Sequence, residues 1–127
     1  MIAAAASREI TPDTVLDALA SRVGPANGLT VHALASLILG APADAAAERT
    51  LRQVIVKLRQ DGVPVCATPA DGYHMPSSAV DLQQTCVHLT QRAMTTLRQV
   101  AAMQRVALPD FYGQLGLPAP IGGSDGK

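Results

Sequence analysis

The sequence predicts a mostly α-helical protein that carries one small β-hairpin and ends in a long helix. Two observations lead to this prediction. Apolar residues recur at the helical period of 3.6 before residue 61 and after residue 77, whereas between these points they alternate with a period of two. The 127 residues include no Trp, one Phe and two Tyr, so Leu, Val, Ile and Ala must supply the core. Such a core suits small helices that pack closely on one another.

The first helix is expected to begin at Thr11. Residues 1–10 include an alanine run without an apolar face, and we expect them to be disordered. Thr11 supplies an N-cap hydroxyl, and proline at position 12 and aspartate at position 13 suit the first helical turn. Gly24-Pro25 is expected to end the element. The apolar positions at helical spacing are Val15, Leu16, Leu19 and Val23.

Two further helices are predicted between residues 30 and 60. Leu29 is a candidate for a very short strand, and Thr30 is expected to cap a helix that runs to Leu39. Its expected inward residues are Val31, Leu34, Leu37 and Ile38. Asp44 is expected to cap a third helix, residues 45–60, which has the clearest helical pattern in the chain. Its expected inward residues are Leu51, Val54, Ile55 and Leu58.

A β-hairpin is predicted directly after the third helix. Val63, Val65 and Ala67 alternate along one strand, and residues 69–72 have turn composition. Residues 73–75 can then return as the second strand. Two strands alone are only marginally stable, so the hairpin should lie against the helices.

The last predicted helix begins near Ser78 and runs to about Val106. Its apolar stripe includes Cys86, and it can form a two-fold seam between two copies of the chain or pack on the preceding part of the same chain. Residues 109–127 are rich in Pro and Gly, and we expect a mostly disordered tail there. The residues expected to form the seam, if the chain dimerises, are Leu82, Leu89, Ala93, Leu97 and Val100.

The order helix, short strand, helix, helix, hairpin is that of a winged helix-turn-helix. The segment 51–65, LRQVIVKLRQDGVPV, followed by GYHM at 72–75, resembles the third helix and wing of bacterial winged-helix regulators. Similar segments occur in the DNA-binding domain of biotin ligase repressors and in small phage-encoded winged-helix proteins. The resemblance covers about 45 of the 127 residues. With the helices and hairpin predicted above, it gives a winged-helix domain at residues 11–76, followed by a C-terminal helix at 77–108. The resemblance also implies DNA binding and transcription regulation.

The third predicted helix has the layout that groove recognition requires. Long polar side chains lie opposite its narrow apolar stripe. Arg can bond guanine and Gln can bond adenine with two hydrogen bonds each, while Lys57 and Arg59 suit phosphates. Small residues at the start of the helix allow a close approach to the groove. The predicted DNA-binding residues are Ala46, Arg49, Thr50, Arg52, Gln53 and Lys57.

The charge distribution leaves a second function class open. The chain is neutral overall, with ten basic and ten acidic residues, and the hairpin from residue 64 to residue 75 contains no Lys or Arg. A wing that follows the minor groove usually offers a cation. A monomer would therefore bind DNA weakly, which favours a homodimer on double-stranded DNA. The alternative is an adaptor that uses the winged helix to bind a host protein, with no direct reading of bases.

Other function classes find no support in the sequence. No hydrolase, metalloprotease or phosphate-loop motif is present, so we expect no enzymatic activity and no cofactor. No apolar run is long enough for a transmembrane helix, and the first six residues do not form a secretion signal, which favours a cytoplasmic protein. A zinc site has the candidate ligands Cys66, His74, Cys86 and His88, but their spacing matches no familiar pattern, and we predict no metal.

Overall fold

The computed structural model describes residues 9–104, 113 and 116. The chain divides into two compact units, Met1–Cys86 and Val87–Lys127. The fold is a winged helix-turn-helix followed by a long C-terminal helix, as the sequence predicts. The predicted disordered segments 1–10 and 109–127 lie largely outside the described residues, but the prediction is wrong at Ile10, which is described and packs against the core.

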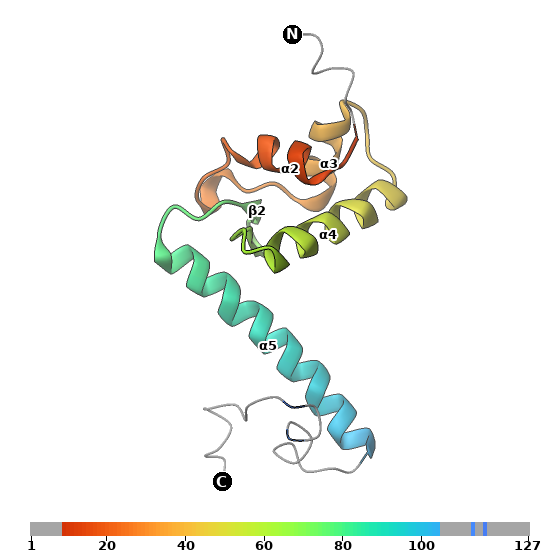
Figure 1. The fold of residues 1–127 in the computed structure, drawn as a ribbon, viewed down its shortest axis with the longest axis vertical. Helices are drawn as coiled ribbons and strands as arrows, with labels where there is room; N and C mark the ends of the chain where they lie inside the picture. The colour runs from red at the N-terminus through yellow and green to blue at the C-terminus, as the bar shows by residue number, and fades with distance from the viewer. Residues whose placement is uncertain (1–8, 105–112, 114–115, 117–127) are drawn as a thin grey trace. The chain divides into compact units, whose positions relative to one another are not determined.

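Three helices form the main body of the first unit. They are α2 (Pro12–Leu19), α3 (Val31–Leu39) and α4 (Ala45–Gln60), with a short 3₁₀ helix η1 (Pro25–Asn27) between α2 and α3. Figure 1 shows α4 running along one side of the pair formed by α2 and α3. The predicted caps are present, because Thr11, Thr30 and Asp44 each accept a backbone hydrogen bond in the first turn.

The core lies where the three helices meet. Leu19 and Leu34 are fully buried from α2 and α3, and Leu51 and Ile55 are buried from α4. Burial of each such side chain stabilises the fold by about 1.5–3 kcal/mol. One core prediction is wrong, since Leu37 is 51% exposed. At 100° per residue the buried side of α3 centres on Leu34, Ala35 and Ile38, and position 37 falls beyond its edge.

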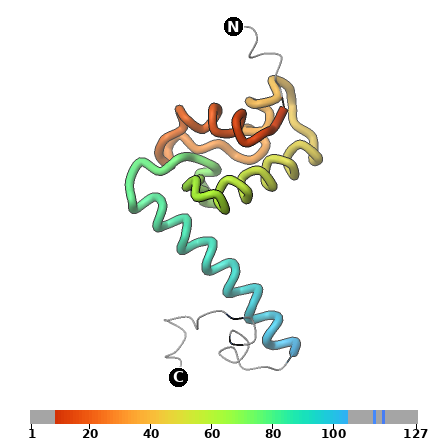
Figure 2. The backbone as a smooth tube through the Cα atoms, in the orientation of Figure 1, coloured from red at the N-terminus to blue at the C-terminus, as the bar shows by residue number. Residues whose placement is uncertain are grey.

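The hairpin consists of β1 (Cys66–Thr68) and β2 (Gly72–His74), paired antiparallel with Cys66 opposite His74. The first strand begins later than the alternation predicts. Residue 63 still donates to Leu58 O at the end of α4, and proline at position 64 has no N–H to donate. The path from α4 through the hairpin into the next helix can be followed in Figure 2.

The second strand is also paired on its other edge. Leu29 and Tyr73 exchange two backbone hydrogen bonds of 2.9 and 2.7 Å, so the predicted short strand at Leu29 is confirmed. Val23 forms a further bridge with Met75. Together with this bridge, α2 ends at Leu19 and not near Val23 as predicted. The Arg22 amide still donates to Leu19 O, but Arg22 O and Gly24 N bond to the backbone of Met75 and are not available to continue the helix.

The hairpin formed by β1 and β2 is the wing of this fold, and the helix α5 (Ala79–Gln104) follows it. Its first eight residues belong to the first compact unit and the remainder to the second. The predicted end of this helix, residues 105–108, lies outside the described residues. Within the described part of the chain, no helix has the length and apolar character needed to cross a membrane.

Candidate nucleic-acid interface

The helix α4 separates an inner edge from an outer face. Asp44 begins the helix by accepting a 2.8 Å hydrogen bond from Ala47 N. Leu51, Ile55 and Leu58 are buried and Val54 is half-buried, which confirms the predicted inner edge. The opposite side of α4, here named the outer face, is exposed along its whole length. Its residues are Ala46, Arg49, Thr50, Arg52, Gln53, Val56, Lys57 and Gln60.

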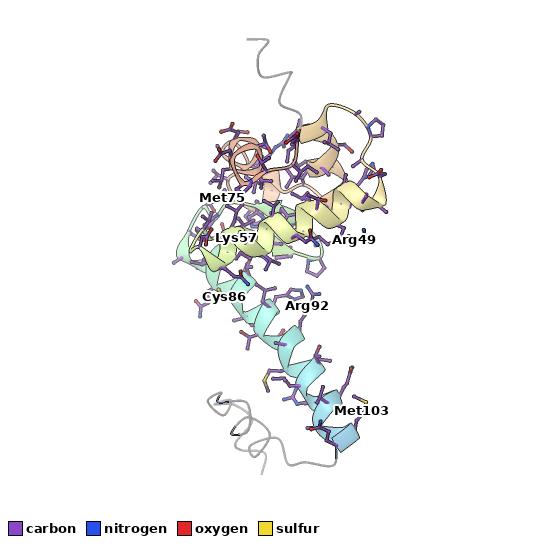
Figure 3. All side chains as sticks on the ribbon, turned by 45° about the vertical axis from the view of Figure 1, so that its right-hand side comes forward. Arg49, Lys57, Met75, Cys86, Arg92 and Met103 are labelled. Atoms are coloured by element: carbon purple, nitrogen blue, oxygen red, sulfur yellow. The ribbon has the colours of Figure 1, made fainter. Side chains whose placement is uncertain are left out.

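All six predicted DNA-binding side chains lie on this outer face. Figure 3 shows Arg49 and Lys57 extending from α4, separated by two helical turns. Arg49 and Gln53 are one turn apart on the same side of the helix, and neither side chain has a hydrogen bond or ion pair with another described residue. The guanidinium of Arg49 and the amide of Gln53 are therefore available to a ligand on this face.

The carboxylate of Glu48 is the only acidic group within α4. Its Oε2 lies 2.8 Å from Nδ1 of His32 on α3, and its Oε1 lies 4.0 Å from the Arg52 guanidinium. The side chain of Glu48 is 23% exposed and that of Arg52 is 57% exposed. The sequence did not predict the contact with His32, because sixteen residues separate the two positions. The contact joins α3 to α4 next to the outer face.

The cation of Lys57 is paired at the other end of α4. Its Nζ lies 3.0 Å from the Asp61 carboxylate, and the two side chains are 63% and 52% exposed. An ion pair at this exposure contributes about 0.2–1 kcal/mol, which is small enough for a phosphate to replace the carboxylate. Lys57 thus remains available for binding an anion.

Arg59 does not have the predicted role of a phosphate ligand. Its side chain is half-buried, and Nε donates a 2.8 Å hydrogen bond to the carbonyl oxygen of Val65, just before β1. The Arg59 side chain thus points toward the hairpin. Its hydrogen bond joins the end of α4 to the residue before β1.

The wing itself presents an acid at its turn. Thr68 Oγ1 donates a 2.7 Å hydrogen bond to the Asp71 carboxylate and accepts one from the Asp71 amide. His74 is 1% exposed, and its Nδ1 lies 3.1 Å from Gly72 O, so it is a core residue. The wing therefore offers negative charge and no cation to a nucleic acid.

A buried threonine that the sequence pattern did not predict holds the first strand of the hairpin. Thr85 in α5 is 2% exposed, and its hydroxyl accepts a 3.1 Å hydrogen bond from Ala67 N in β1. The neighbouring Cys66 is fully buried, and burial raises the pKa of its thiol. A threonine on a polar helix gives no sequence signal for such a contact, because its partner lies eighteen residues away.

The predicted dimerisation stripe is divided between the two units. Leu82 belongs to the first unit, whereas Leu89, Ala93, Leu97 and Val100 belong to the second. Leu82 and Ala93 are exposed, and the other three side chains are half-buried. The stripe therefore retains exposed apolar surface that a second copy of the chain could cover.

The cysteines and histidines form no cluster within the described residues. Cys66 is buried and Cys86 is exposed, and neither forms a disulfide. Among residues 9–104, 113 and 116, no three His, Cys, Asp or Glu side chains come together as a metal site would require.

Comparison with protein-family models, with curated proteins and with solved structures gave no match for this chain. The resemblance to bacterial and phage winged-helix regulators therefore stays a prediction. The functional argument depends on the outer face of α4 itself.

Proposed function

We propose that this protein binds double-stranded DNA sequence-specifically, as a homodimeric transcriptional regulator of bacterial or phage origin that acts in the cytoplasm and catalyses no reaction. The observation that carries the proposal is the outer face of α4. Arg49, Arg52, Gln53 and Lys57 are all exposed there, on the helix that precedes the wing in a helix-turn-helix. Side chains of this kind on such a helix can enter the major groove.

The chemistry of these side chains divides the interface into two parts. Arg49 and Gln53 can each make paired hydrogen bonds to a base edge, Arg to guanine and Gln to adenine. Lys57, near the end of α4, provides a point charge on a long side chain that suits phosphate. Loss of Arg49 should therefore relax sequence preference, whereas loss of Lys57 should weaken binding to all sequences equally.

Charge considerations favour a dimer. Net charge is zero, Glu48 lies beside the outer face, and the wing offers no cation, so one copy supplies few favourable contacts to phosphate. Two copies on one duplex raise affinity through effective concentration. In this proposal the exposed part of the stripe on α5, including Ala93, forms the two-fold seam.

A gel-shift series with genomic fragments at increasing salt tests DNA binding. We expect selective retardation at low salt that weakens steeply as salt rises. Arg49→Ala and Arg52→Ala should each lower the affinity roughly tenfold or more. Arg92→Ala is the matched control, because Arg92 is an exposed arginine outside α4 (Figure 3). Absence of selective retardation, or unchanged binding by both α4 variants, would refute the proposal.

Light scattering tests the dimer separately. We expect the wild type to have the mass of two chains and Ala93→Glu to have the mass of one, because the new charge would lie within the seam. Gln91→Glu adds the same charge on a different side of α5 and should remain dimeric. A monomeric wild type would show that the seam does not form.

Exposed apolar side chains favour a second candidate function, an adaptor that binds a host protein. Leu37 is 51% exposed and Val80 is 58% exposed on a protein without net charge. A pull-down from nuclease-treated host lysate distinguishes the two functions. A specific host protein retained without nucleic acid, and lost in Leu37→Asp, would support the adaptor. Loss of every partner on nuclease treatment would count against it.

A further inference from the structure

Val56 occupies the middle of the outer face of α4. Its side chain is 50% exposed. At 100° per residue it lies within about 60° of Arg49, Gln53 and Gln60 on the helical circumference. An aliphatic side chain therefore stands among the polar groups that the proposed function assigns to the major groove.

Val56 takes no part in the core cluster of the fold. Val56 lies opposite the buried Leu51, Ile55 and Leu58, and it is not part of the core. Valine also has a lower helix propensity than Ala, Leu, Gln or Lys, because its branched Cβ is restricted against the preceding turn. A half-exposed valine in the middle of a helix therefore costs helix stability and adds nothing to the core cluster.

We propose that Val56 contacts the 5-methyl group of a thymine in the major groove, and so selects a T·A base pair in the recognition sequence. This inference rests on the proposed function. The thymine methyl is the one apolar group that a base pair displays in that groove, and small apolar side chains recognise it. The flanking Arg49, Arg52 and Lys57 supply the positive charge that a duplex requires, which favours DNA over a protein surface as the occupant.

The position of Val56 along α4 adds a constraint on the sequence that is read. Val56 follows Gln53 by three residues, which is about 4.5 Å along the helix axis, a length between the rise of one base pair, about 3.4 Å, and that of two. Gln53 suits adenine, so the two side chains together select an adenine and a thymine at neighbouring positions. Arg49 lies one further turn away on the same face and suits guanine.

Replacement of thymine by deoxyuridine tests the inference, because it removes only the methyl group. A duplex is first enriched from a random pool by the full-length wild-type protein. Each thymine of that duplex is then replaced in turn, and affinity is measured by fluorescence anisotropy for the wild type, Val56→Ala and Val80→Ala. The last variant is the matched control, because Val80 is an exposed valine on α5. Alanine favours helix more than valine does, and circular dichroism will verify that each variant is folded.

We expect one thymine whose replacement lowers wild-type and Val80→Ala affinity about fourfold, the effect of one methyl group. The same replacement should leave Val56→Ala affinity unchanged. If the enriched duplex binds selectively but every uracil affects the wild type and Val56→Ala alike, the inference is wrong while the proposed function stands. If no duplex can be enriched, the proposed function fails. If Val56→Ala keeps the wild-type response to every uracil but no longer retains a host protein in the pull-down described above, the face binds protein and the inference is overturned.

Discussion

Substitution of Gly72 by alanine should disrupt the pairing of β2 with the short strand at Leu29. Gly72 has a φ of +77°, and a Cβ at this position would lie 2.3 Å from the Leu29 carbonyl oxygen and 2.8 Å from Thr30 N. These are backbone atoms, so the short strand at Leu29 must move away from β2. The two hydrogen bonds between Leu29 and Tyr73 would then be lost.

The structure allows the cost to be divided between two causes. The left-handed backbone costs an alanine about 1–2 kcal/mol, of which the smaller entropy of the unfolded chain offsets about 0.4–1 kcal/mol. Each lost backbone hydrogen bond costs about 1 kcal/mol. Gly72→Ala should therefore lower the free energy of unfolding by about 3 kcal/mol, a large share of the 5–15 kcal/mol typical of a small protein.

Two other glycines provide matched controls. Gly62 has a φ of +94°, but no atom lies within 4 Å of a Cβ placed there, so Gly62→Ala has only the conformational cost, about 0–1.6 kcal/mol net. Gly28 has a φ of −66°, which alanine adopts without strain, but the new Cβ would lie 2.0 Å from Asp71 O. Gly28→Ala therefore has only the steric cost. Urea denaturation followed by circular dichroism measures all three variants. If Gly72→Ala costs no more than Gly62→Ala, the close approach of Leu29 to β2 is wrong.

Three further results are expected. Cys86 is exposed and should react with a thiol reagent within minutes in the native protein. Cys66 is fully buried and the pKa of its thiol is raised, so it should react only as the protein unfolds. Equal reaction rates for the two thiols would contradict the burial of β1. Hydrogen bonds from the Ser77 hydroxyl and amide hold the pKa of Asp81 below its ordinary value, so they stabilise the fold above about pH 4 and are lost as the pH falls through the folded-state pKa. The stability difference between wild type and Asp81→Asn, measured in urea at pH 6, should therefore shrink at pH 2.5, and a constant difference would show that the hydrogen bonds from Ser77 do not stabilise the fold. Glu48→Gln removes the negative charge beside the outer face of α4. Anisotropy titrations at low salt should therefore show that affinity for DNA rises roughly fivefold. Weaker binding by this variant would show instead that Glu48 positions Arg52.

Local sequence patterns predicted α4 well. Its cap at Asp44 and its inner edge from Leu51 to Leu58 depend on contacts between residues three and four positions apart, which the helical period displays directly. The exposure of Arg49 and Gln53 follows from the same period. The candidate site was therefore predictable because it lies on one regular helix.

Contacts between distant segments account for what the sequence did not predict. The end of α2 is set by the bridge between Val23 and Met75, fifty-two residues apart. The half-buried Arg59 and the buried Thr85 both bind the backbone of the first hairpin strand or the residue before it. Each of these side chains is polar and looked like a surface residue, because burial of a polar group depends on a partner that only the folded chain supplies.

The most direct test of the central claim is a nuclear magnetic resonance titration of the full chain with the enriched duplex. We predict that the largest chemical-shift changes occur at the backbone amides of Arg49, Gln53 and Lys57 and at the methyl groups of Val56. Chemical-shift changes confined to α5, with α4 unaffected by a bound duplex, would contradict the account.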